Sequence, residues 1–148
     1  MSEAVTTLTR LLVVREVHET DTGATISFYQ GGHGCLCIRD ANYAFELRLA
    51  HRSQERQHPI GVRFADAHAI TALIRADNDV PALVREEGPD GTRVLFQGHD
   101  VVFRLKGDHP DSARIRSLLH QALEHKVPVW FIADKSDLAL LDVVLGTT

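Results

Sequence analysis

Val14-Arg15-Glu16 recurs about seventy residues later as Val84-Arg85-Glu86, and the residues around the two copies keep one order. A glycine turn follows each copy, at Gly23 and at Gly91. Self-similarity at a fixed offset indicates repeated architecture. We therefore predict a tandem duplication, with a first repeat over residues 8–76 and a second over 77–148. The further matches are Phe28-Tyr29-Gln30-Gly31 with Leu95-Phe96-Gln97-Gly98, Ala65-Asp66 with Ala133-Asp134, and Ala44, His51, Glu55 and Pro59 with Ala113, His120, Glu124 and Pro128.

Repeats of this size have small cores that bury little surface on folding. We therefore expect the two halves to pack together as one globular unit, or to be completed by a second copy of the chain. The apolar segment 138–145 is a poor candidate for an exposed edge strand, so we expect either the other half or a second subunit to cover it, the second of which would make a homodimer.

Hydrophobic patterning predicts the same six elements in each half. The segment 42–57 contains good helix formers and lacks Gly and Pro, although Phe45, Leu47 and Leu49 alternate with polar residues as in a strand. We predict a helix there because its counterpart after Asp111 has a clear helical stripe. The predicted strands are 11–17, 25–29, 35–39 (with Leu36 and Ile38 inward), 60–64 and 69–75, then 80–86, 93–97, 101–105, 127–132 and 138–145.

Each half is thus predicted as strand, strand, strand, helix, strand, strand. This order resembles the OB-fold, a small five-stranded barrel whose helix lies between the third and fourth strands. The resemblance concerns element order alone and implies no function. The predicted fold class is α+β, a duplicated, small, antiparallel, barrel-like unit. A single larger sheet with two helices is the alternative.

The charge pattern argues against nucleic-acid binding. The net charge is −4, and it resides in the second half, which has eight Lys and Arg against twelve Asp and Glu, whereas the first half has eight of each. Nucleic-acid surfaces need clustered basic residues. The longest apolar runs are far shorter than a membrane span, and the N-terminus lacks a leader pattern. We expect a cytoplasmic protein that binds neither membrane nor nucleic acid.

His33, Cys35 and Cys37 are residue types that bind zinc. On a regular strand His33 and Cys37 would stand about 13 Å apart, too far to share one ion. No fourth ligand follows nearby, and the aligned residues of the second half are Asp100, Val102 and Arg104. We therefore predict no metal and no cofactor. A Cys-His pair acting in nucleophilic catalysis would also need an oriented base and oxyanion donors, which the sequence does not reveal.

Tyr29 and Phe96 are predicted to point outward from the second strand of each half, where exposed aromatics could stack on a ligand or partner. The sequence contains no catalytic motif. We predict a non-enzymatic binding or assembly module that recognises a partner protein or small ligand on the outer face of strands two and three. The alternative is a small enzyme or metal protein that uses His33 and the cysteines. The predicted contact residues are Tyr29, His33, Cys35, Cys37, Arg39 and Phe96.

Overall fold

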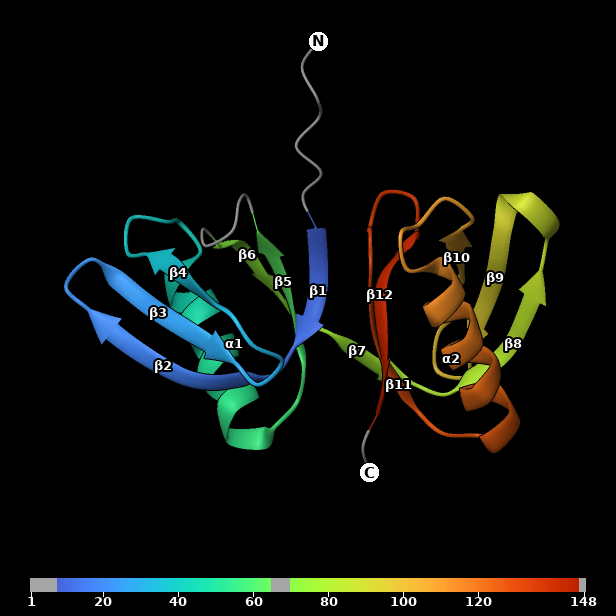
Figure 1. Cartoon of the computed structure of the whole chain (residues 1–148), viewed down its shortest axis with the longest axis horizontal. Coiled ribbons are helices and arrows are strands. Elements are labelled where there is room, and N and C mark those ends of the chain that lie inside the picture. The colour runs from blue at the N-terminus through green and yellow to red at the C-terminus, as the bar shows by residue number, and fades with distance from the viewer. Residues whose placement is uncertain (1–7, 65–69, 147–148) are drawn as a thin grey trace, which may run out of the picture. The chain divides into compact units, whose positions relative to one another are not determined.

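The computed structural model describes residues 8–64 and 70–146, and the chain divides after Ala76 into two compact units (Figure 1). Each unit is an α+β arrangement of antiparallel strands and one helix. The matched Asp66 lies outside the described residues. Its counterpart Asp134 accepts hydrogen bonds from the backbone and the hydroxyl of Ser136, so it closes a turn.

The first unit has four strands, a helix and two further strands. Strands β2, β3 and β4 form one antiparallel sheet, and β1, β5 and β6 form another in the order β1-β5-β6. The bounds are β1 Leu8–Leu12, β2 Val14–Thr20, β3 Gly23–Phe28, β4 His33–Cys37, α1 Tyr43–Arg56, β5 Ile60–Phe64 and β6 Ile70–Ile74.

The second unit has the same order of strands and helix. Its sheets are β8-β9-β10 and β7-β11-β12, again antiparallel. The bounds are β7 Asp77–Asp79, β8 Pro81–Glu86, a short 3-10 turn Gly88–Asp90, β9 Gly91–Phe96, β10 Val102–Lys106, α2 Ser112–His125, β11 Val129–Ala133 and β12 Leu140–Leu145.

The expected count of three strands before each helix was wrong. The predicted strand 11–17 is interrupted at Val13, where the chain passes from β1 in one sheet to β2 in the other. The second unit likewise has the short strand β7 before β8. The α+β class is confirmed, as is the helix over residues 43–50. Within the described residues the strands form four separate three-stranded sheets, none of which closes into a barrel.

Both units contain the same local irregularities. The pairing of β2 with β3 shifts after Val14, which faces Phe28, and that of β8 with β9 shifts after Pro81, which faces Phe96. Gly23 and Gly91 then open β3 and β9 with positive φ. A Cβ at either glycine would collide with the carbonyl oxygen of Leu36 or of Leu105 on the next strand. Only glycine allows this close approach.

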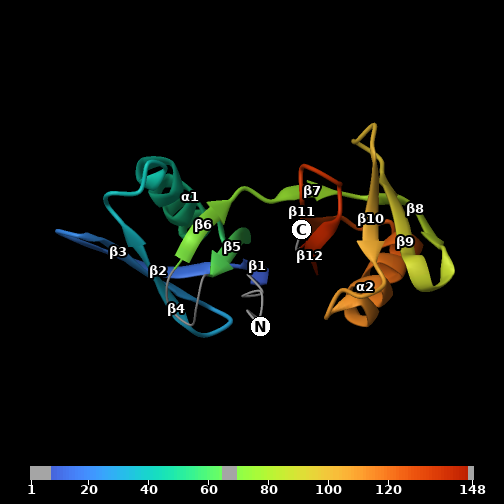
Figure 2. The ribbon, with the colours of Figure 1, turned by 90° about the horizontal axis from the view of Figure 1, so that it is seen from above.

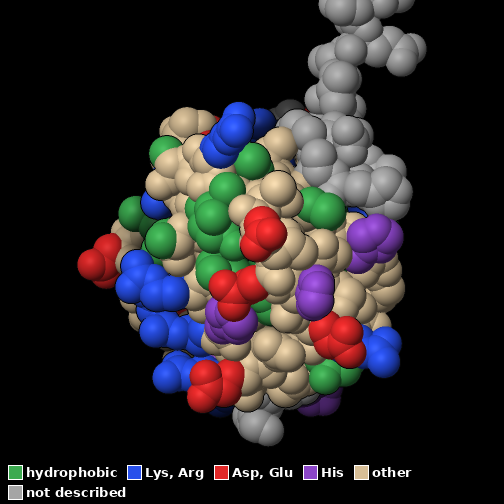
Figure 3. Space-filling view, turned by 90° about the vertical axis from the view of Figure 1, so that its left-hand side faces the viewer, with side chains coloured by type: hydrophobic (Ala, Val, Ile, Leu, Met, Phe, Trp, Pro, Cys, Tyr) green, Lys and Arg blue, Asp and Glu red, His purple; other side chains and the backbone are tan. Residues whose placement is uncertain are grey.

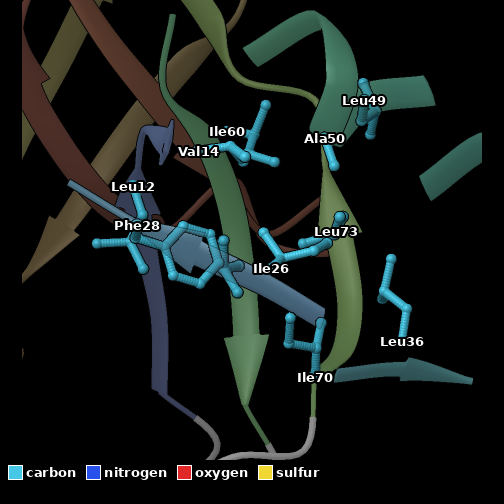
Figure 4. Close-up of a cluster of buried hydrophobic side chains, with 11 residues drawn as sticks. Leu12, Val14, Ile26, Phe28, Leu36, Leu49, Ala50, Ile60, Ile70 and Leu73 are labelled. Carbon is cyan, nitrogen blue, oxygen red and sulfur yellow. The ribbon is translucent and has the colours of Figure 1, made fainter. Parts of the chain in front are cut away.

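Each unit has its own hydrophobic core, filled by the inward side chains of its sheets and helix. In the first unit Val14, Ile26 and Phe28 pack with Leu49 and Ala50 of α1 (Figure 4). In the second unit the core is built around Phe96, Phe103 and Phe131. Burial of these side chains is the main favourable term in folding.

Each helix lies against the strands of its own unit (Figure 2). Both helices have 14 residues and are followed by a residue in the left-handed conformation, Gln57 or Lys126. Near the middle of each, a histidine reaches a glutamate of the neighbouring strand. His51 Nε2 is 3.5 Å from a carboxylate oxygen of Glu19, and His120 Nε2 is 2.8 Å from one of Glu86. No helix in the described part of the chain is long and apolar enough to cross a membrane.

Candidate functional site

Three of the predicted contact residues share the outer face of β4. His33, Cys35 and Cys37 are exposed and alternate with the buried Gly34 and Leu36. Both cysteines are free thiols, and the Cys35 Sγ lies 4.0 Å from the Thr25 hydroxyl on β3. The strand places these groups in line rather than around one point. Across 8–64 and 70–146, no group of three or more His, Cys, Asp or Glu side chains is arranged to hold a metal ion.

Tyr29 and Arg39 lie just beyond the ends of β3 and β4, and both are exposed, Tyr29 at 57%. Ile38 was expected to point inward and is 50% exposed, because β4 ends at Cys37 and the alternation ends with it. The end of the first unit that carries β2, β3 and β4 gathers hydrophobic side chains at its centre, with basic side chains along one side (Figure 3).

A cavity of about 340 Å³ opens where β4 ends against the β2–β3 turn. Its lining comes from Asp21 and Thr22 of the turn and from Cys37, Ile38 and Arg39. The cavity thus combines a carboxylate, a guanidinium and a thiol around an apolar side chain. The exposed lining is mainly apolar with a few polar groups, which suits a small ligand, and no hydrogen bond among the described residues joins the Cys37 thiol to a base.

Phe96 does not lie on the outer face, and the prediction that it points outward was wrong. Its side chain is 1% exposed and stacks on Phe131 with ring centroids 4.1 Å apart. The sequence alignment paired Phe96 with Tyr29, whereas the strand register places it where Phe28 lies in the first unit. A slip of one residue moves a side chain to the opposite face of a strand, which accounts for the error.

The aromatic cluster around Phe96 is covered by a His-Asp pair. The His99 ring packs edge-on against Phe96, Phe103 and Phe131, and its Nδ1 lies 2.6 Å from an Asp79 carboxylate oxygen. Burial alone would raise the pKa of Asp79, but hydrogen bonds from His99 and from the Val80 and Gly98 amides outweigh it and lower the pKa. We interpret the His99–Asp79 pair as structural, because its hydrogen bond holds the β9–β10 loop against β7.

Sequence reasoning missed the most distinctive surface, the outer face of the sheet β8-β9-β10. Arg85 pairs with Arg93 across β8 and β9, and Arg93 pairs with Arg104 across β9 and β10. All three are exposed, and we call them the arginine row. The next row of the same face is aliphatic: Leu83 pairs with Leu95, and Leu95 with Val102.

Two members of the aliphatic row are exposed, Leu83 at 47% and Val102 at 50%, while Leu95 between them is half-buried. Val101 beside the row is 41% exposed. In the first unit the positions that correspond to the aliphatic row are Glu16, Ser27 and His33. The positions that correspond to the arginine row are His18, Thr25 and Cys35. The outer faces therefore differ completely in chemistry although the backbones pair alike.

Side chains directly opposite on antiparallel strands stand about 5 Å apart, so like charges there oppose folding. Arg93 has one compensating contact, with the Glu87 carboxylate at 2.5 Å. Among the described residues, Arg85 and Arg104 make no ion pair with a carboxylate. The alternation of Arg93 with Leu95, and of Val102 with Arg104, is visible in the sequence, but only the register brings the three cations together.

Three comparisons with known proteins gave no match: no family model fits the chain, and no curated protein or solved structure is significantly similar to it.

Proposed function

We propose that the protein is a non-enzymatic binding or assembly module that recognises its partner on the outer face of the second and third strands of a unit. The observation that carries this proposal is the arginine row beside the aliphatic row on the sheet β8-β9-β10. Exposed apolar side chains beside like charges that face each other across strands are unfavourable for the free chain. A partner that supplies anionic groups and an apolar surface would relieve both costs.

The outer face of the first unit belongs to the same proposal with different chemistry. Tyr29, His33, Cys35, Cys37 and Arg39 offer hydrogen bonds, thiols and one cation beside the cavity at the end of β4. We propose that this face binds a partner protein or a small ligand. Two dissimilar faces on similar scaffolds suit a module that joins two partners.

The duplication and the barrel-like architecture are also part of the proposal. Both units contain the same element order, bulge position and strand-opening glycine. In the second unit β10 lies beside the start of β12, since the Arg104 amide donates to the Leu138 carbonyl at 3.0 Å and Arg104 forms a parallel bridge with Ala139. These contacts support an OB-like unit whose two sheets approach each other at that edge.

Binding of fluorescein-labelled polyglutamate to the intact chain, measured by fluorescence anisotropy, tests the arginine row. We expect saturable binding that weakens at least tenfold in Arg85→Thr/Arg93→Thr/Arg104→Thr. The control, Arg48→Thr/Arg52→Thr/Arg56→Thr, removes three exposed charges from α1 and should bind like the wild type. We expect the free energy of unfolding of the first variant to be about 1 kcal/mol higher than that of the wild type, because repulsion between the three arginines is removed. Equal binding by both variants would exclude this face.

The alternative is a small enzyme or metal protein that uses His33, Cys35 and Cys37, and it rests on two exposed thiols beside a cavity. Metal analysis of the purified protein together with thiol titration distinguishes the two. One zinc per chain, lost together with the fold on chelation, would favour the alternative. A cytoplasmic location and a homodimeric assembly remain predictions, and sedimentation of the purified chain measures the second.

A further inference from the structure

We infer that the partner of the sheet β8-β9-β10 is an amphipathic α-helix with an apolar stripe and a flanking line of carboxylates. This inference rests on the proposed function and adds the chemical class of the partner. The helix would lie across the strands, with its apolar stripe over Leu83, Leu95 and Val102 and its carboxylates over the arginine row.

The spacing of the two rows supports a helix in that orientation. Neighbouring strands lie about 4.8 Å apart, so each row presents one side chain about every 5 Å over three strands. A helix advances about 5.4 Å per turn, and residues at i, i+3 or i+4, and i+7 present one side chain per turn along one line. The apolar stripe of a helix therefore matches a row that crosses the strands.

The distance between the rows also fits. On each strand the arginine row lies two residues from the aliphatic row, about 6.6 to 6.8 Å away. Carboxylates beside the apolar stripe of a helix are displaced sideways by a comparable amount, and the long Arg side chains can cover the remainder. Guanidinium groups bind carboxylates through paired hydrogen bonds, which fixes the register of the helix.

In the free protein Glu87 supplies one of the carboxylates that a partner helix would bring to the arginine row. Its carboxylate contacts Arg93, the middle residue of the row, while Arg85 and Arg104 on either side have no described carboxylate partner. Lys106 also faces outward on β10, but its ammonium group already forms an ion pair with Asp137 at 3.0 Å. The two outer arginines are therefore the groups open to a partner's carboxylates.

The face is less suited to single-stranded nucleic acid. Bases bind such surfaces by stacking on aromatic side chains. Phe96 and Phe103, the aromatic residues of β9 and β10, both point into the core. The outward positions beside the arginines hold Leu and Val instead, which favour the aliphatic side chains of a peptide.

The experiment titrates the intact chain into labelled peptides of about 18 residues. One has Leu at helical i, i+3, i+4 and i+7 spacing with Glu along one side; the second has the same composition in scrambled order; the third has Lys in place of Glu. We expect micromolar binding of the first, at least tenfold weaker binding of the other two, and a gain of helical circular dichroism on binding. The lysine peptide tests the charge dependence without altering the protein.

Two variants locate the site. Arg85→Thr/Arg93→Thr/Arg104→Thr and Leu83→Ser/Val102→Ser should each lose at least tenfold in affinity for the first peptide, while Arg48→Thr/Arg52→Thr/Arg56→Thr should retain it. If polyglutamate binds through the arginine row but the ordered and scrambled peptides bind equally, the helix is excluded while the proposed function stands. If no anionic probe binds, both fail. Tighter binding to a 12-nucleotide single-stranded DNA, or to phosphatidylserine-containing vesicles, would overturn the helical partner.

Discussion

Helices α1 and α2 occupy equivalent places in the two units, yet α1 buries Glu46 and Ser53 where α2 buries Ile115 and Ala122. Glu46 and Ser53 each form a hydrogen bond with a backbone amide. In the second unit one of these amides binds a different side chain, and the other is replaced by a proline. A buried polar side chain is therefore found on the helix where a nearby backbone amide needs a hydrogen-bond acceptor. The two units thus show how one scaffold accommodates different interior chemistry.

Glu46 provides the first example. Its Oε2 accepts a 2.7 Å hydrogen bond from the amide of Leu73 on the edge strand β6. The corresponding amide of the second unit, Val143 on β12, donates instead to Asp142 at 2.9 Å, and Arg114 of α2 holds that carboxylate at 2.6 Å. A carboxylate satisfies the same edge-strand amide in both units, but it comes from the helix in one and from the strand in the other.

Ser53 provides the second example. Its hydroxyl accepts a hydrogen bond from the Val14 amide at 3.0 Å and donates to the His58 carbonyl at 2.6 Å. In the second unit Pro81 holds the place of Val14. Proline has no amide hydrogen, so Ala122 can replace the hydroxyl without leaving a buried donor unpaired.

The largest expected difference between the units comes from their aromatic cores. Phe96→Ala should lower the free energy of unfolding by about 5 kcal/mol and Phe28→Ala by about 3 kcal/mol. Phe96 touches Phe103 and Phe131, whereas among the described residues Phe28 has one aromatic neighbour, Phe64, with ring centroids 6.3 Å apart. Urea unfolding of both variants measures the difference. Equal losses would show that the cluster adds nothing beyond ordinary burial.

An intermediate effect is expected at the helix–strand amide. Ser53→Ala should cost about 2 kcal/mol, because the buried Val14 amide loses its acceptor. The double variant Ser53→Ala/Val14→Pro should recover part of the loss, because proline has no amide hydrogen to leave unpaired. The reverse change in the second unit, Ala122→Ser, places a hydroxyl beside Pro81. Chemical unfolding of the three proteins tests the pairing. No recovery in the double variant would indicate that the hydroxyl acts through His58 alone.

The smallest effect concerns Glu46, which is 3% exposed and lies close to the Asp40 carboxylate. Burial raises the pKa of Glu46, and the negative charge of Asp40 adds to the rise, while the Leu73 amide partly offsets it. A raised folded-state pKa means that the stability contributed by the protonated form is lost as the pH rises through that pKa.

Glu46→Gln should therefore become more stable relative to the wild type as the pH rises from about 4 to about 8, by about 1 kcal/mol at the upper end. Gln retains an acceptor for Leu73 and introduces no charge. Thermal unfolding across this pH range measures the trend, with Ile115→Leu as a pH-independent control in the second unit. A difference that shrinks with rising pH would contradict the assignment.

Local patterns in the sequence predicted much of the scaffold. The helix over Tyr43–Arg56 was identified in spite of the alternation of Phe45, Leu47 and Leu49, because its counterpart after Asp111 has an unambiguous stripe. The match of His51 with His120 also agrees with the structure, where both reach a glutamate of the adjacent strand. Helical periodicity and glycine turns are short-range signals that one segment can carry alone.

Strand register could not be obtained in the same way. The break at Val13, the inward position of Phe96 and the alignment of Arg85, Arg93 and Arg104 all depend on which residues face each other across strands. The matched triplets Val14-Arg15-Glu16 and Val84-Arg85-Glu86 illustrate the limit, because Val14 corresponds in register to Pro81 and not to Val84.

The sequence by itself determined where the two helices lie and which glycines open β3 and β9, but it did not determine the number of strands before each helix. The tertiary structure decided which side chains form the core and which form the arginine row. The physical reason is that side chains alternate between the two faces of a strand, so a shift of one residue exchanges core for solvent. Only hydrogen bonding to the neighbouring strands, with its bulges after Val14 and Pro81, fixes that choice.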